Sequence, residues 1–266
     1  MATRRLRGFD LRQIKGHHGL IGVDEAGRGA LAGPVVAAAV LLTDAFLQSD
    51  WCRRYAGRIN DSKKLTEERR GQFHERMSWL MTEHRILFAA GVGTVGEIEQ
   101  LNILGATTLA MRRAILNVLT LGQIRPHAPD PLFDGLEPDR PEPGGCISDW
   151  KVLIDGRPVR DLGFKHRALV EGDARSLVIA MASIVAKVTR DRLMESLEPA
   201  YPEYGLARHK GYGTELHRQA LVRKGASVIH RSLFVRKALQ GAAFDGQRAF
   251  SFLETEADTV QSVRST

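Results

Sequence analysis

The order of apolar and polar positions along the chain predicts five short β-strands. One leads into Asp24 and a second covers 34–42, and the glycine-rich stretch between them favours a connected pair. Further short apolar runs, bounded by polar residues or glycine, predict strands over 86–92, 151–155 and 168–170.

Helical spacing of apolar residues predicts longer segments between and after these strands. A helix begins at Thr66, a suitable N-terminal cap, and runs to about His84. Helical patterns also cover 97–121 (in one or two pieces), 177–197, 215–224 and 233–239. The pattern over 177–197 is small and apolar on one side and basic, with Arg190, on the other, while 43–57 is expected to be an irregular connection. Paired strands followed by alternating strands and helices predict one α/β domain with a mixed sheet and a helical C-terminal region.

Composition separates three segments from this domain, which spans 19–240. Residues 1–18 form a basic N-terminal extension that lacks the apolar region of a secretory signal, and a short transit peptide is an open alternative. Residues 122–149 hold six prolines and many acids without periodicity, which is typical of a disordered surface insertion. Residues 241–266 are polar and acidic, so a flexible tail is expected.

The charge balance indicates the class of partner. The net charge of +7 suits a polyanion, because Lys and Arg replace the counterions of phosphates, although an ordinary basic protein remains an alternative. No apolar run is long enough for a membrane span. Two cysteines without metal-binding spacing fit a reducing compartment, so we expect a cytoplasmic protein.

Acids stand at the ends of two predicted strands. Asp24 and Glu25 end the first strand, Asp155 ends a later one, and Asp173 lies in the turn before the longest helix. Such acids converge at one edge of a sheet, and buried neighbouring carboxylates need a compensating cation. Oxygen ligands suit Mg²⁺ or Mn²⁺, and two such ions roughly 4 Å apart assist phosphodiester cleavage. A solvated turn is the alternative, and alternation along a strand separates Asp24 from Glu25 unless the strand twists or ends there.

Three polar blocks have the residues that phosphates and sugars require. Arg28 lies between Gly27 and Gly29, which allow close approach of a ligand. The block 60–64, with Lys63, is either a phosphate-binding loop or a solvated helix entry. In the block 209–214, His209 and Lys210 suit phosphates and Tyr212 offers a flat face to a sugar or base, with a surface loop as the alternative.

Six ordered motifs resemble bacterial ribonuclease HII: GVDEAGRG at 22–29, NDSKKL at 60–65, LNILGAT at 101–107, VLIDG at 152–156, ASIVAKVTRDRLM at 182–194 and HKGYGT at 209–214. The resemblance covers about 19–239 and implies a ribonuclease H-like fold with a metal-dependent endonuclease activity. The family's carboxylates fall on Asp24, Glu25, Asp155 and Asp173. Its element that senses the ribose 2′-hydroxyl falls on 27–29, and the tyrosine that packs on the sugar at the RNA–DNA junction falls on Tyr212.

The resemblance further implies the substrates, which are RNA–DNA hybrids and duplex DNA that contains ribonucleotides, cut on the 5′ side to leave 3′-hydroxyl and 5′-phosphate ends. Excision repair and replication are the implied roles, and a monomer is expected. A catalytically silent hybrid-binding protein and a related polynucleotidyl transferase are the alternatives. All four carboxylates are present, which disfavours the first, and the Gly-Arg-Gly element disfavours the second. The first motif has no large module before it, which disfavours ribonuclease HIII. Residues 247–253 loosely resemble sliding-clamp peptides, or they pack onto the domain as a helical turn.

Overall fold

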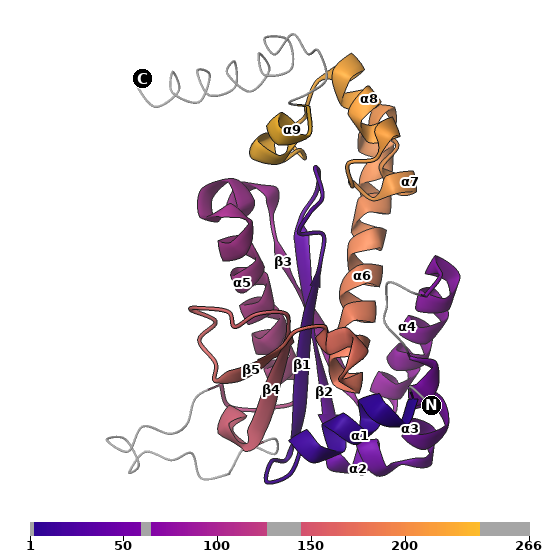
Figure 1. Cartoon of the computed structure of the whole chain (residues 1–266), viewed down its shortest axis with the longest axis vertical. Helices are drawn as coiled ribbons and strands as arrows, with labels where there is room; N and C mark the ends of the chain where they lie inside the picture. The colour runs from indigo at the N-terminus through magenta and orange to yellow at the C-terminus, as the bar shows by residue number, and fades with distance from the viewer. Residues whose placement is uncertain (1–2, 60–64, 127–144, 240–266) are drawn as a thin grey trace. The chain divides into compact units, whose positions relative to one another are not determined.

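The computed structural model of the chain describes residues 3–59, 65–126 and 145–239, which form two compact units (Figure 1). Unit 1 lies within Met1–Ala26, Val36–Gly93 and Thr107–Thr189. Unit 2 lies within Gly27–Val35, Thr94–Ala106 and Arg190–Thr266. Each unit therefore combines segments that are far apart in the sequence.

Unit 1 is built on a mixed five-stranded sheet, which confirms the predicted fold class. The strands are β1 (Gly19–Ala26), β2 (Val35–Thr43), β3 (Leu87–Gly93), β4 (Trp150–Asp155) and β5 (His166–Leu169), in the spatial order β3-β2-β1-β4-β5. β1 is antiparallel to β2 and parallel to β4, and β4 is parallel to β5. The strand predicted at 168–170 therefore begins two residues earlier than expected and ends at Leu169.

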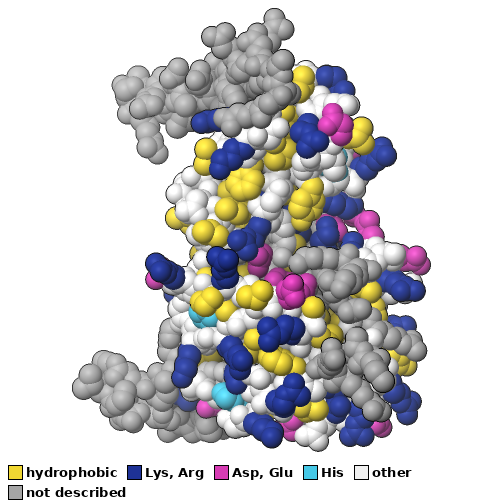
Figure 2. All heavy atoms as spheres, in the orientation of Figure 1, with side chains coloured by type: hydrophobic (Ala, Val, Ile, Leu, Met, Phe, Trp, Pro, Cys, Tyr) yellow, Lys and Arg dark blue, Asp and Glu magenta, His cyan; other side chains and the backbone are white. Residues whose placement is uncertain are grey.

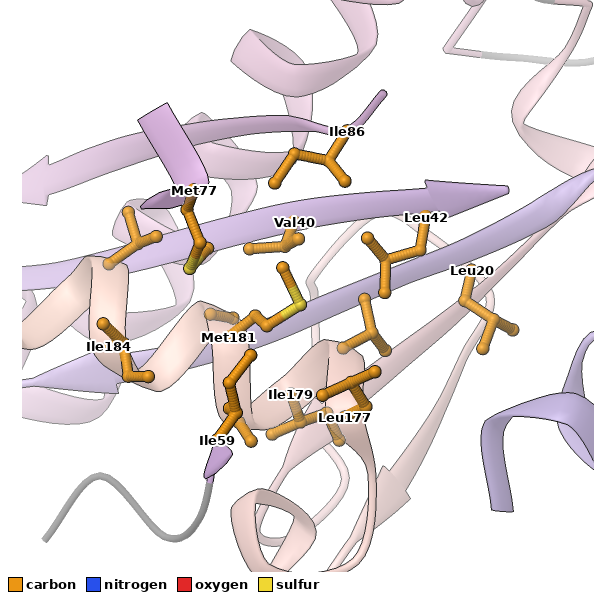
Figure 3. Close-up of a cluster of buried hydrophobic side chains, with 14 of the residues drawn as sticks. Leu20, Val40, Leu42, Ile59, Met77, Ile86, Leu177, Ile179, Met181 and Ile184 are labelled. Carbon is orange, nitrogen blue, oxygen red and sulfur yellow. The ribbon is translucent and has the colours of Figure 1, made fainter. Parts of the chain in front are cut away.

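Helices cover both faces of this sheet. Within unit 1, Figure 1 shows the part of α5 (Val95–Leu121) that begins at Thr107 on one side of the sheet. The part of α6 (Leu177–Leu197) that ends at Thr189 lies on the other side, with α4 (Glu67–Thr82). On the α6 side, alternate residues of the strands form a core with the apolar face of α6 (Figure 3). Its fully buried members include Leu20, Val40, Leu42, Leu177, Ile179 and Met181. Each such side chain stabilises the fold by about 1.5–3 kcal/mol relative to exposure.

The connection over 43–57 is helical, which corrects the prediction of an irregular segment. It contains α2 (Asp44–Gln48) and α3 (Asp50–Tyr55). Each short helix has a side-chain cap: Thr43 Oγ1 accepts the Phe46 N–H, and Ser49 Oγ accepts the Cys52 N–H, both at 3.2 Å. Helices this short show no complete apolar period, so the caps are their main sequence signal.

The basic N-terminal segment belongs to the core, although it was expected to be an extension outside the domain. It forms α1 (Thr3–Gln13), and Leu6 and Ile14 are buried in the same cluster as the sheet. Asp10 is fully buried and its Oδ2 accepts the Val178 N–H in the first turn of α6 at 2.9 Å. The segment therefore supports the N-terminus of the helix that covers the sheet.

Helices α4 and α5 confirm two predictions. α4 begins at Glu67, and the Oγ1 atom of the preceding Thr66 accepts the Arg69 N–H at 3.3 Å. α5 is broken at Asn102, whose φ is 60° and ψ is 173°. Asn102 Oδ1 accepts the Leu104 N–H at 2.8 Å, so the second piece of α5 starts at an asparagine cap.

The proline-rich segment has two described ends that pair with each other. Arg125 donates its N–H to the Gly145 carbonyl and accepts the Ile147 N–H, both at 2.9 Å. Residues 127–144 lie outside the described part of the chain, so the disorder expected there stays a prediction.

Unit 2 is mainly helical, as expected for the C-terminal region. Besides the first part of α5 and the end of α6, it holds α7 (Leu206–His209), α8 (Glu215–Lys224) and α9 (Ser232–Leu239). Its own apolar cluster joins Leu31 and Ala32 to Met194, Leu221 and Val235. Among the described helices of the whole chain, none has the length and apolar character that crossing a membrane requires.

Candidate active site

Two neighbouring strands of unit 1 end on the acids that the sequence singles out. β1 and β4 run parallel, and their last paired residues are Val23 and Ile154. Asp24 and Asp155 come next on the two strands, so their side chains leave the same face of the sheet. Asp24 shares that face with Gly22, which α6 covers. The register therefore supports the predicted convergence of Asp24 and Asp155.

Helix α6 lies close to this edge because β1 has a glycine there. A Cβ atom on Gly22 would lie 2.5 Å from the Val178 carbonyl carbon, which is too close for any other residue. One turn further along α6, Ser183 forms a side-chain hydrogen bond with Asp24, whose Oδ1 also accepts the Glu25 N–H at 2.7 Å. Asp24 is only 5% exposed, so it is held inside unit 1.

Asp173 lies in a 3₁₀ turn, Gly172–Ala174, shortly before α6. This turn is fastened to β4, because the Gly172 N–H donates to Asp155 Oδ1 at 2.6 Å. A Cβ at 172 would lie 2.8 Å from Ile179 Cδ1 and 3.0 Å from Asp155 Oδ1, so a side chain there would displace these atoms. Asp173 is itself buried. It follows a residue bonded to Asp155, so these two acids belong to one neighbourhood.

Glu25 fits the predicted cluster least well. Alternation along β1 directs its side chain to the face opposite Asp24, and β1 continues to Ala26 instead of ending before it. Glu25 is half-buried, and its negative charge still raises the pKa of Asp24. It therefore borders the other acids, and its role as a metal ligand stays a prediction.

The electrostatic environment of Asp24 opposes its ionised form. Burial is the largest cause that raises the pKa of Asp24 well above its ordinary value, and the negative charges of Glu25 and Asp155 raise it further. The hydrogen bonds from Ser183 and from the Glu25 backbone act in the opposite direction without cancelling this rise. A buried carboxyl group that faces two other acids is a characteristic mark of a functional site.

The donor set fits a hard divalent cation in its chemistry. The residues are carboxylates without thiol or imidazole, and a cation would remove the repulsion that Asp24 experiences. In the described ranges, no three His, Cys, Asp or Glu side chains are gathered closely enough to hold a metal ion. Movement of the carboxylate oxygens towards an ion is therefore part of any metal-binding proposal for this edge.

In unit 2 the two glycines of the Gly-Arg-Gly turn have different uses. Gly27 has a φ of 92°, and a Cβ there would lie 1.9 Å from Arg190 Nε, so the position is required for an internal contact. A Cβ on Gly29 would meet nothing within 4 Å. Arg28 is exposed, and its carbonyl accepts a hydrogen bond from Arg231 Nη1 at 3.0 Å. Arg28 and Gly29 therefore remain accessible for the predicted ligand contact.

His209 and Lys210, which the sequence assigns to phosphate binding, have internal contacts in the structure, and this corrects their expected role. Both are buried. His209 Nε2 donates to the Tyr204 carbonyl at 2.8 Å, and its ring stacks on His217 with a centroid distance of 4.3 Å. Lys210 Nζ lies 2.5 Å from Glu195 Oε1. These two side chains therefore support the loop that carries Tyr212.

Tyr212 and Lys63 complete the predicted set. Tyr212 is half-buried, and the centroid of its ring lies 5.1 Å from Arg190 Cζ. One part of the ring thus contacts the protein and another part is exposed. Lys63 lies outside the described residues, together with the rest of 60–64, and its role stays a prediction.

Sequence reasoning missed several buried bases in unit 2. Arg190 was expected on the basic side of its helix, and it is fully buried, as is Arg231. His217 and His230 are also buried, and their Nε2 atoms lie 3.1 Å apart. The sequence signal that relates to the burial of Arg190 is Gly27, because a glycine there leaves room for the guanidinium.

Solved structures with the same fold are ribonucleases H. The match to Bst-RNase HIII in complex with Mn²⁺ has a TM-score of 0.57 and 20% identity, and covers 88% of this chain and 73% of that one. The ribonuclease H2 from Pyrococcus horikoshii OT3 matches with a TM-score of 0.51 and 24% identity, over 84% and 97% of the two chains. The RNase HII of a PCNA complex from Archaeoglobus fulgidus matches with a TM-score of 0.52 and 22% identity, over 77% and 87%. The protein therefore has the ribonuclease H-like fold.

Comparison of sequences assigns the family. The family model described as Ribonuclease HII matches residues 21–134 and 142–237. A Ribonuclease HII of Fusobacterium nucleatum is 43% identical over 223 residues, which are 83% of this chain and 87% of the relative. One from Desulfitobacterium hafniense is 41% identical over 221 residues, or 83% and 70% of the two chains. The chain belongs to the ribonuclease HII family, and is thus an endonuclease with ribonuclease H activity on RNA–DNA hybrids.

Proposed function

We propose that this enzyme hydrolyses the phosphodiester on the 5′ side of a ribonucleotide, both in RNA–DNA hybrids and where ribonucleotides are embedded in duplex DNA. The products are a 3′-hydroxyl and a 5′-phosphate. The observation that carries the proposal is the pair Asp24 and Asp155, whose side chains extend from the same face of the sheet at the ends of adjacent strands. The negative charges of its neighbours repel the ionised form of Asp24. The enzyme acts as a cytoplasmic monomer in replication and ribonucleotide excision repair.

The acids of unit 1 are the proposed ligands for two Mg²⁺ or Mn²⁺ ions. Asp24 and Asp155 are the central pair, Asp173 comes from the turn bonded to Asp155, and Glu25 completes the set. When bound, such ions supply an activated water and stabilise the leaving oxygen. Ser183 and the Gly172 N–H hold Asp24 and Asp155 in place for this task.

Recognition of the ribonucleotide is assigned to unit 2. The turn Gly27–Gly29 is proposed to sense the ribose 2′-hydroxyl, because Arg28 is exposed and Gly29 has open space beside it. Tyr212 is proposed to pack on the sugar at the RNA–DNA junction through the exposed part of its ring. Lys63 remains a proposed substrate contact, whereas the internal contacts of His209 and Lys210 make those residues supports for Tyr212.

The surface charge suits a nucleic acid. Lys and Arg side chains are spread over the face shown in Figure 2. They agree with the net charge of +7 and allow many weak contacts with phosphates. We therefore expect binding to weaken steeply as the salt concentration rises.

Cleavage of a duplex that contains a single ribonucleotide tests the proposal. The wild-type protein is incubated with this duplex, with an all-DNA duplex of the same sequence and with a long RNA–DNA hybrid, each with and without Mg²⁺. We expect metal-dependent cleavage of the two ribonucleotide-containing substrates, with a 3′-hydroxyl end directly 5′ of the ribonucleotide. Cleavage of the all-DNA duplex at a similar rate would refute the proposed specificity.

A further inference from the structure

The loop that carries Tyr212 is held by its backbone carbonyls. The Lys210 carbonyl accepts Arg190 Nη1 at 2.8 Å, and the Gly211 carbonyl accepts the Leu31 N–H at 2.8 Å. The Tyr212 carbonyl lies 3.0 Å from His217 Nδ1, and the Gly213 carbonyl accepts Arg218 Nη1 at 2.7 Å. Four consecutive carbonyls thus have donors from outside the loop, although its two glycines would otherwise leave it flexible.

Arg190 joins this loop to a second segment of unit 2. Its Nε donates to the Pro34 carbonyl at 3.0 Å and its Nη2 to the Ala32 carbonyl at 3.1 Å, while Nη1 reaches Lys210. Pro34 and Ala32 belong to the segment that begins with the Gly-Arg-Gly turn. The same guanidinium lies 5.1 Å from the centroid of the Tyr212 ring. One side chain therefore contacts both segments to which substrate recognition is assigned.

The position of Arg190 also explains the requirement for Gly27. A Cβ on residue 27 would lie 1.9 Å from Arg190 Nε and 2.4 Å from Cδ, so any side chain there would displace the guanidinium. Lysine could not replace Arg190, because a single ammonium cannot reach three carbonyls that diverge around a planar fork. The turn and the arginine are thus matched to each other.

Arg231 provides an internal comparison. It is also fully buried, and its guanidinium donates to the Gly33 carbonyl at 2.9 and 2.8 Å and to the Arg28 carbonyl at 3.0 Å. These hydrogen bonds all end within 27–35. Its ring contact is with Phe234, at 5.4 Å. The hydrogen bonds of Arg231 therefore support one of the two segments, whereas those of Arg190 join both.

We propose that Arg190 is a positioning residue, which fixes the Tyr212 ring relative to the Gly27–Gly29 turn so that a ribose and the adjoining sugar are recognised together. This inference rests on the proposed function, because it assumes that Tyr212 and the turn contact the substrate. Arg190 is buried and need not touch the substrate itself.

A double-mutant cycle tests this role. Arg190→Lys, Tyr212→Ala and the double variant are compared on the single-ribonucleotide duplex and on a long hybrid, with Arg231→Lys as the matched control. We expect Arg190→Lys to raise KM on the single-ribonucleotide duplex about tenfold, and to add little once Tyr212 is alanine, since coupled residues are not additive. For the control, the effects of Arg231→Lys and Tyr212→Ala on KM should multiply when the two changes are combined. Full multiplication for Arg190→Lys, or an equal loss of kcat on every substrate, would refute the inference.

Two further measurements keep the test decisive. Circular dichroism establishes whether each variant is folded, and if Arg190→Lys is not, Gly27→Ala displaces the same guanidinium and is judged by the same cycle. Wild-type cleavage separates the two levels of the proposal. If the wild-type protein does not cut the single-ribonucleotide duplex, the proposed function fails, whereas wild-type cleavage with a multiplicative cycle refutes Arg190 alone.

Discussion

Among the described Asp, Glu, His, Lys and Arg residues, those buried in unit 1 are acids, and those buried in unit 2 are bases apart from Asp191. Burial shifts the pKa values of buried acids and buried bases in opposite directions. In unit 1, desolvation raises the pKa of Asp10 to about 7 and that of Asp24 well above its usual range. In unit 2, desolvation lowers the pKa of Arg231 to about 9 and that of His217 to about 4. In each unit the buried group is held at a cost to its charged form.

The two units differ in how that cost is offset. The two buried arginines of unit 2 are surrounded by carbonyl acceptors, and each guanidinium has three such bonds. Asp24 in unit 1 receives hydrogen bonds, but it also faces the negative charges of Glu25 and Asp155. Buried charges whose hydrogen-bonding groups all have partners indicate a structural role. Buried carboxylates that repel one another, as around Asp24, indicate a site for a cation.

Removal of the repelling charge gives the largest expected effect. Asp24→Asn or Asp155→Asn should abolish cleavage of the single-ribonucleotide duplex while hybrid binding largely survives, because each change keeps the shape and removes a charge of the proposed metal site. In metal-free buffer at neutral pH, Asp24→Asn should melt at the same temperature as the wild type or higher, since a repulsion has been relieved.

The matched control for this prediction is Asp161→Asn. Asp161 is exposed and has a φ of 58°, a conformation that asparagine adopts readily, so cleavage and melting should both stay unchanged. Near-normal turnover of Asp24→Asn or Asp155→Asn at limiting Mg²⁺ would show that the altered acid is not a ligand.

The sequence predicted the acidic edge of unit 1 better than it predicted the buried bases of unit 2. Asp24 and Asp155 follow short apolar runs, and both the strand period and the strand ends are local signals. The burial of Arg190 depends instead on carbonyls at 32, 34 and 210, which the fold brings together from distant parts of the chain. No local pattern records such contacts, so a basic residue on a helix was read as surface.

The same reasoning explains the other differences from expectation. Asp10 lies in a basic segment, and its bond to the Val178 N–H joins residues 168 positions apart. His209 and Lys210 have the composition of a phosphate-binding loop, yet their partners, Tyr204 and Glu195, are residues whose proximity the sequence does not reveal. Residue type predicted the chemistry, and tertiary contacts decided which residues are available for it.

Opposite pH dependences should distinguish the two units, beginning with Asp10. Its pKa rises from 3.8 to about 7 on folding, so the folded state binds the extra proton and this contribution to stability is lost as pH rises through that window. Asp10→Asn should therefore gain stability over the wild type at pH 8, by roughly 4 kcal/mol at most, and the gain should shrink towards pH 4. Urea unfolding at a series of pH values measures the difference.

His217 should behave in the reverse sense. Its pKa falls from 6.5 to about 4 on folding, so its contribution is fully present above pH 6.5 and is lost as pH falls towards 4. His217→Asn retains a donor for the Tyr212 carbonyl but loses the acceptor near His230, so it should be less stable at pH 8. That deficit should narrow as pH falls. If the stability differences of the two variants from the wild type changed in the same direction with pH, the opposite pKa shifts assigned to Asp10 and His217 would be contradicted.

The smallest effect is expected from deleting 241–266, which lie outside the described residues. If the described part of unit 2 is complete without the tail, truncation should leave the melting temperature and the cleavage of short duplexes unchanged. Binding to a sliding clamp should disappear, because 247–253 would act as a tether that raises the local concentration of enzyme on DNA. A tail with Phe250→Ala and Leu253→Ala should reproduce that loss at full length. A clear fall in melting temperature would instead show that these apolar residues pack on the domain. The core of unit 2 would then include part of the tail.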